Sequence, residues 1–151
     1  MTTFFDTSVL FSALNENEAD HEWSKEQLES AERPIVIVDI VYAEFSVGMP
    51  SISDVNDALT GLFIERYQGD DRILFLAAKT FLKYKRDNTG PKLGLLPDFL
   101  IGAAAAITNS PLVTINSRDF VKYFPTVRLI APPRMINPPQ TGNITSAARP
   151  R

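Results

Sequence analysis

Short apolar runs separated by longer stretches of helical spacing make up most of the chain. The run Ile35–Val38 is rich in β-branched residues, as in a parallel strand that is covered on both faces. Further strands are expected at the start of Thr2–Leu14, which runs straight from strand into helix, and in Leu112–Ile115 and Val127–Ile130. This alternation predicts an α/β sandwich with a mainly parallel central sheet.

Helices are predicted in the stretches between these strands. They are expected to begin near Asp20, Asp39, Ser53, Asp70 or Asp71, Pro97 and Asn116. Phe63, at the end of the third of these helices, is expected to face the core. The helix after Pro97 contains Gly102–Ala106, a run of small residues that lets a helix lie close against a sheet.

The character of the chain changes at Pro132. From there it contains several prolines and no apolar periodicity, so we expect residues 132–151 to form an extended or disordered tail. Residues 1–131 are expected to form one domain, and the sequence shows no internal repeat.

Composition excludes several kinds of chemistry. Among the 151 residues there is no cysteine, which rules out disulfides, thiolate metal sites and cysteine nucleophiles. The lone histidine, His21, lies in a polar stretch, so histidine-based zinc sites and serine–histidine triads would depend on it alone. There is no signal-peptide pattern, and the longest nearly uncharged run, Leu93–Ile107, is too short to span a bilayer. We expect a cytoplasmic protein with no membrane association.

The formal net charge of −3 argues against a protein that coats nucleic acid, because such proteins are basic. An acidic protein can still process nucleic acid where metal ions supply positive charge and a local basic face supplies the rest. Five basic residues gather near the end of the helix that begins at Asp70 or Asp71 and in the loop after it. They are Lys79, Lys83, Lys85, Arg86 and Lys92, and they form either a solvated face or a ridge that contacts phosphate.

Four carboxylates interrupt otherwise apolar contexts. Asp6 follows the first strand, Glu44 lies inside an apolar helix, Asp98 heads the small-residue helix, and Asp119 follows the strand Leu112–Ile115. Three have a plain alternative, because Asp6 can be a turn residue, Asp98 an N-cap and Asp119 a surface acid at a helix start. Glu44 is the hardest to explain in this way, because a buried carboxylate is costly unless it is paired or bound to a cation.

Four acids at one edge of a sheet would repel one another unless a hard divalent cation held them together. Mg²⁺ prefers carboxylate oxygens and keeps several waters in its shell. Such a site can bind phosphate, orient a water molecule and neutralise charge on a leaving oxygen. The residues therefore favour metal-dependent hydrolysis of a phosphodiester.

Four motifs in order also resemble a known family. They are Phe5–Leu10, Val41–Phe45, Leu95–Ala103 and Leu112–Phe120. Together they resemble the PIN domain, and within it the VapC-type toxins of toxin–antitoxin pairs, from about residue 3 to residue 131. The resemblance implies a three-layer α/β/α sandwich and a Mg²⁺- or Mn²⁺-dependent endoribonuclease that acts on RNA, with tRNA as one candidate.

The resemblance also implies roles for the acids. Asp6 and Asp98 would be metal ligands, and Glu44 would complete the catalytic pocket through water. The fourth acidic position of the family corresponds either to Asn116 or to Asp119. We favour Asp119, as both catalytic acid and metal ligand. The remaining polar neighbours, Thr7, Ser8, Thr114 and Asn116, would support these acids.

Two further consequences concern substrate and partners. Ala104 stands where close relatives often carry histidine, which removes any substrate contact from that side chain. Candidate contacts to RNA phosphates are Arg86, Lys92 and Arg118. The family also implies a homodimer, and a small cognate antitoxin that inserts a peptide, often with a basic side chain, into the acidic pocket.

Three rival functions fit parts of the pattern. A catalytically silent PIN-like module could use the acidic pocket to bind a peptide or protein. A flap-type deoxyribonuclease usually has more acids and large helical insertions, for which this chain has no room. A phosphoacceptor domain with Asp6 as its nucleophile would need a lysine at a strand end, and none is suitably placed.

Overall fold

The computed structural model describes residues 2–88 and 96–133. Strands and helices alternate along the chain. Their bounds are β1 (Thr3–Phe5), α1 (Thr7–Leu14), α2 (His21–Ser30), β2 (Ile35–Val38), α3 (Asp39–Ser46), α4 (Ile52–Gly61), β3 (Ile64–Tyr67), α5 (Asp71–Asp87), α6 (Leu96–Ile107), β4 (Leu112–Val113), α7 (Arg118–Tyr123) and β5 (Leu129–Ile130). The predicted tail lies almost wholly outside the described residues.

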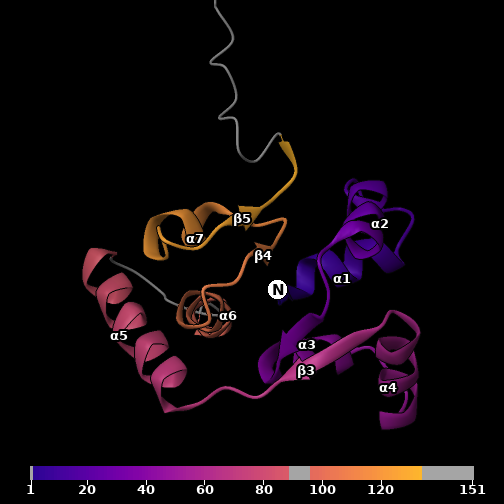
Figure 1. The fold of residues 1–151 in the computed structure, drawn as a ribbon, viewed down its shortest axis with the longest axis horizontal. Coiled ribbons are helices and arrows are strands. Elements are labelled where there is room, and N and C mark those ends of the chain that lie inside the picture. The colour runs from indigo at the N-terminus through magenta and orange to yellow at the C-terminus, as the bar shows by residue number, and fades with distance from the viewer. Residues whose placement is uncertain (1, 89–95, 134–151) are drawn as a thin grey trace, which may run out of the picture.

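The five strands form one sheet in the order β3-β2-β1-β4-β5, and every pairing is parallel. The register places Thr3 beside Ile35 and Phe4 beside Leu112. Figure 1 shows α5 and α6 on one side of the strands and α1 and α2 on the other. The predicted three-layer α/β/α sandwich with a parallel sheet is confirmed.

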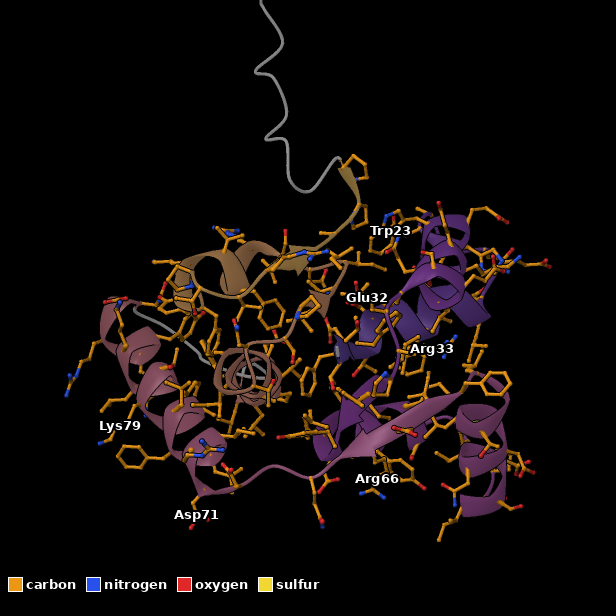
Figure 2. All side chains as sticks on the ribbon, in the orientation of Figure 1. Trp23, Glu32, Arg33, Arg66, Asp71 and Lys79 are labelled. Atoms are coloured by element: carbon orange, nitrogen blue, oxygen red, sulfur yellow. The ribbon has the colours of Figure 1, made fainter. Side chains whose placement is uncertain are left out.

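The central strands supply the middle of the hydrophobic core. Phe4, Phe5, Ile35 and Leu112 have no exposed surface, as expected for parallel strands covered on both faces. The side chains of α5, by contrast, reach solvent along its outer face, where Figure 2 shows Lys79 pointing away from the sheet.

The small residues of α6 allow a close approach, as predicted, but the partner is a side chain. A Cβ added to Gly102 would lie 2.5 Å from the Phe124 ring, well inside van der Waals contact. Phe124 follows α7, so the glycine lets the end of α7 pack directly on α6. Both helices carry acids of interest, and this contact helps to fix their relative position.

The segment between α4 and α5 corrects the sequence prediction. Strand β3 was not predicted, because Glu65 and Arg66 are exposed at the sheet edge and only Ile64 is buried. Phe63, which was predicted to face the core, is 74% exposed and has a φ of 55° in the turn before β3. The guanidinium of Arg33 lies 5.7 Å from the centre of its ring.

Two predicted helix starts also differ. Helix α4 begins at Ile52, and its N-cap is Ser51, whose Oγ accepts a hydrogen bond from the Asp54 amide at 3.1 Å. Asp39 is the first residue of α3 and does not cap it. Its carboxylate instead pairs with Arg66 of β3 at 2.7 Å.

No helix within residues 2–88 and 96–133 is both long and apolar enough to cross a bilayer.

Candidate active site

The strand order creates a crevice at one edge of the sheet. After β1 the chain adds β2 and then β3 on one side of it. It then crosses over and adds β4 and β5 on the other side. Ligands of open parallel sheets bind beyond the carboxyl ends of the strands, where the direction of winding reverses. In this sheet the reversal lies between β1 and β4, and the residues that follow these two strands are Asp6 and Thr114.

Asp6 is held by hydroxyl groups from two elements. Its Oδ2 accepts hydrogen bonds from Thr114 Oγ1 at 2.8 Å and from Ser8 Oγ at 3.0 Å. It occupies the N-cap position of α1, but its side chain makes no capping hydrogen bond. The buried carboxylate of Asp6 therefore binds hydroxyl groups and does not cap the backbone amides of α1, as a simple turn residue would.

Thr114 is itself oriented by the loop after β4. It has no exposed surface, and its Oγ1 accepts a hydrogen bond from the Asn116 amide at 3.0 Å. The Thr114 hydroxyl proton is thereby directed at Asp6. The Asn116 side chain is exposed, so the contact that the structure shows comes from the backbone of this residue.

Glu44 comes from α3 and is half-buried rather than buried. Its Oε1 accepts a hydrogen bond from Thr7 Oγ1 at 2.9 Å. The sequence pattern predicts a cation beside a buried Glu44 charge, and in the structure the Thr7 hydroxyl supplies one polar partner for it. Thr7 and Ser8 thus each hold one of the acids, and neither side chain caps the helix in which it lies.

The pKa of Asp98 responds to the charges of the other three acids. It is the third residue of α6 and half-buried, so it lies in the first turn and is not the N-cap. Burial, together with the negative charges of Asp6, Glu44 and Asp119, raises the pKa of Asp98 from 3.8 to about 7, and burial is the largest of these causes. Because charges influence a carboxyl in this way only over short distances, the other three acids lie near enough to Asp98 for their charges to act on it.

These carboxylates have the chemistry that a hard divalent cation requires. They offer oxygen donors, and their mutual repulsion is the kind that a cation would relieve. Within residues 2–88 and 96–133, however, no three acidic or histidine side chains already converge as a closed metal cluster. The donor set fits Mg²⁺ or Mn²⁺ in type and charge, and binding would require the side chains to draw together.

The other candidate residues differ in element and in exposure. Arg118 is exposed in the first residue of α7, beside the half-buried Asp119. Arg86 is exposed in the last turn of α5, and Lys92 lies outside the described residues. Ala104 is fully buried, so its position offers no surface to a substrate.

His21 has a structural contact. Its Nδ1 lies 2.8 Å from the backbone oxygen of Ser12, which joins the start of α2 to α1.

Comparison with known protein families decides the classification. A family model of the PIN domain matches residues 3–123, which is most of the chain and lies inside the predicted domain 1–131. The chain belongs to the PIN-domain family. Comparison by sequence with curated proteins finds no match.

Solved structures of toxin–antitoxin proteins share the fold. VapBC2 from Rickettsia felis, bound to a promoter DNA fragment, has a TM-score of 0.64 at 20% identity, covering 87% of this chain and 98% of that chain. A toxin–antitoxin complex from Klebsiella pneumoniae has a TM-score of 0.61 at 23% identity, covering 83% and 94%. VapC20 from Mycobacterium tuberculosis, a sarcin–ricin loop cleaving toxin, has a TM-score of 0.54 at 15% identity, covering 72% and 84%. At these identities the likeness is one of fold.

Proposed function

We propose that this PIN-domain protein is a metal-dependent endoribonuclease and the toxin of a toxin–antitoxin pair. The observation that carries the proposal is the raised pKa of Asp98, which three other acids from three separate elements help to produce. Groups with strongly perturbed pKa values in a crevice are candidates for function. Similarity in fold to a toxin that cleaves the sarcin–ricin loop supports RNA as the substrate class.

In this proposal Asp6, Asp98 and Asp119 hold a Mg²⁺ or Mn²⁺ ion, and Glu44 completes the pocket through water. When bound, the ion would supply a Lewis acid for the phosphoryl oxygen and lower the pKa of the attacking water. The chain's own hydroxyl groups position the acids, because Thr114 and Ser8 hold Asp6 while Thr7 holds Glu44.

The protonation of Asp98 links cation binding to pH. With a pKa of about 7, its carboxyl retains part of its proton at neutral pH. Carboxylate ligands bind metal in the deprotonated form, so loading the site releases that proton. Cation affinity is therefore expected to rise between pH 6 and pH 8.

The proposed partner is a small antitoxin that inserts a basic side chain into the acidic pocket. Similar folds occur in toxin–antitoxin complexes from Rickettsia felis and Klebsiella pneumoniae. The negative charge around Asp98 complements such a side chain. We further propose that the protein acts in the cytoplasm and as a homodimer.

A pool of tRNA and structured RNA tests the nuclease directly. The purified protein is incubated with this pool in Mg²⁺, Mn²⁺ or chelator, beside the variants Asp98→Asn and Asp57→Asn. Asp57 is exposed on α4 and supplies a matched loss of one charge. We expect metal-dependent cutting by the wild type and Asp57→Asn, with most activity lost in Asp98→Asn. Equal cutting by both variants would contradict the site assignment.

A catalytically silent PIN module is the alternative, and one observation favours it. The acids of the described residues do not form a ready-made metal cluster. In that case the pocket would hold a basic peptide. Absence of cutting by folded, partner-free protein in every metal, together with binding of such a peptide, would support this alternative.

A further inference from the structure

A polar cavity of about 290 Å³ lies between the end of α5 and the short helix α7. The acid-based mechanism uses Asp119 from its lining and leaves the rest of the cavity without a role. Its lining residues are Tyr84, Asn88, Arg118, Asp119, Lys122 and Tyr123. Sequence reasoning singled out Arg118 and Asp119 from this set but passed over the cavity that they share with α5.

Two cations stand at the cavity. Arg118 and Lys122 are four residues apart on α7, so they project from the same face of the helix. Both are exposed, and neither forms an ion pair with a carboxylate in the described parts of the chain. Lys122 Nζ also lies 5.2 Å from the centre of the Tyr123 ring, a contact that does not neutralise its charge. Two cations on one face without a carboxylate partner repel each other, and a bound anion would remove that repulsion.

The wall behind these cations is rigid. Both hydrogens of the Asn88 amide are used, because Nδ2 donates to the Tyr84 backbone oxygen at 2.9 Å and to the Tyr123 hydroxyl at 3.1 Å. The Tyr123 hydroxyl in turn donates to Asp87 at 3.3 Å. Tyr123 is buried, and its ring meets that of Tyr84 edge to face with centres 5.4 Å apart. The cavity is therefore held open by contacts within the protein.

Asp119 links the cavity to the candidate active site. This carboxylate lines the cavity and is also one of the charges that raise the pKa of Asp98. It is the one acid among the described lining residues, and as a metal ligand its charge would be directed to the ion. Arg118 and Lys122 then make the net charge of the cavity lining positive.

We propose that this cavity binds a phosphate of the RNA strand next to the one that is cleaved, with Arg118 and Lys122 as its cations. Arginine and lysine supply charge-assisted hydrogen bonds to phosphate oxygens, and arginine can do so through two parallel bonds. The inference rests on the proposed nuclease function, because the phosphate is placed by its neighbour at the acidic pocket.

Salt-dependent binding to RNA tests this subsite without relying on activity. The probe is a fluorescein-labelled single-stranded RNA of mixed sequence, titrated by anisotropy with the Asp98→Asn protein in Mg²⁺ at several salt concentrations. In this background we compare the double variant Arg118→Gln/Lys122→Gln with the control Lys25→Gln/Arg128→Gln. Lys25 and Arg128 are exposed and do not line the cavity, and the control removes the same two charges.

Loss of the one phosphate contact that Arg118 and Lys122 share is expected to make the slope of log affinity against log salt shallower by about 0.7, the contribution of one phosphate of a single strand. Affinity at low salt should fall by about tenfold or more. The control should keep the slope of its parent. The charge-conserving variant Arg118→Lys/Lys122→Arg should also keep it, which separates loss of charge from misfolding.

The outcomes separate the two proposals. If the Asp98→Asn parent binds the RNA and both charge-removing variants alter the slope equally, the subsite is refuted and the nuclease proposal stands. An unchanged slope in Arg118→Gln/Lys122→Gln would also refute the phosphate subsite and leave the nuclease proposal standing. If the parent does not bind RNA at all, the proposed function itself fails, and the subsite with it.

Discussion

Replacing Asp98 with asparagine should stabilise the metal-free protein at neutral and alkaline pH. The carboxyl of Asp98 has its pKa raised from 3.8 to about 7 by burial and by three neighbouring acids, so its charged form is unfavourable in the folded state. Asparagine has nearly the same shape and does not ionise. The substitution removes the cost of the charge and keeps the packing of α6.

The size of the effect follows from the raised pKa. At about 1.4 kcal/mol per pH unit, a change from 3.8 to about 7 corresponds to roughly 4 kcal/mol. Asp98 is half-buried, so water screens part of this charge, and we expect about 2 kcal/mol. For a domain of this size that gain raises Tm by about 5 °C.

The sign depends on pH in a defined way. The unfolded carboxyl ionises near pH 3.8, whereas the folded one keeps its proton until about pH 7. The wild type therefore loses stability between these two values and loses no more above pH 7. Asp98→Asn should match the wild type near pH 4, gain a little at pH 5 and show its full advantage at pH 8.

Urea denaturation in EDTA at pH 5 and pH 8 measures this advantage, with Asp57→Asn as the control for the loss of one exposed charge. Adding Mg²⁺ at pH 8 should stabilise the wild type more than Asp98→Asn, because a ligand that binds only the folded state adds to its stability. A variant that is less stable than the wild type at pH 8, or whose advantage is the same at both pH values, would refute the reasoning.

Two further substitutions test other parts of the structure. Thr114→Val removes the hydroxyl that holds Asp6 and should weaken Mg²⁺ binding by about ten- to hundredfold in calorimetric titration. Thr126→Val, at an exposed site, is the control and should leave Mg²⁺ binding unchanged. Equal Mg²⁺ affinities of the two variants would mean that the hydrogen bond does not position Asp6. Gly102→Ala drives a methyl group into the Phe124 ring and should cost about 1–3 kcal/mol in thermal unfolding. Gly61→Ala, whose Cβ would meet open space, should be neutral or stabilising, and a similar loss in both would refute the close-contact argument.

The parts of the fold that could be predicted are those with a strong local pattern. Strand β2 is four consecutive buried apolar residues, and the sheet order gives it neighbours on both sides. Strand β3 has only one neighbour, exposes Glu65 and Arg66, and so has no apolar signature. The same edge explains Phe63, whose place is set by a left-handed turn and by Arg33 rather than by a hydrophobic face.

The candidate site shows a similar division. Carboxylates that break apolar runs could be found in the sequence, and the parallel sheet gave a reason to bring them to one edge. The resemblance named Thr7, Ser8 and Thr114 as supporting residues, but the acid that each one holds could not be predicted, because a hydroxyl group in a sequence does not reveal its partner. The cavity at α7 was missed because two of its six lining residues, Tyr84 and Asn88, come from the end of α5, far away in the sequence.

The position of β1 at the centre of the sheet also determines when the site can exist. Asp6 lies among the first residues of the chain, but the hydroxyl of Thr114 that holds it is 108 positions away. Closing so long a loop costs conformational entropy, and it cannot happen before residue 114 has been synthesised. A ribosome that has not yet released β4 carries a chain with a carboxylate at position 6 but no pocket around it. The acidic centre thus depends on contacts between residues far apart in the sequence, and no short segment of the chain carries it alone.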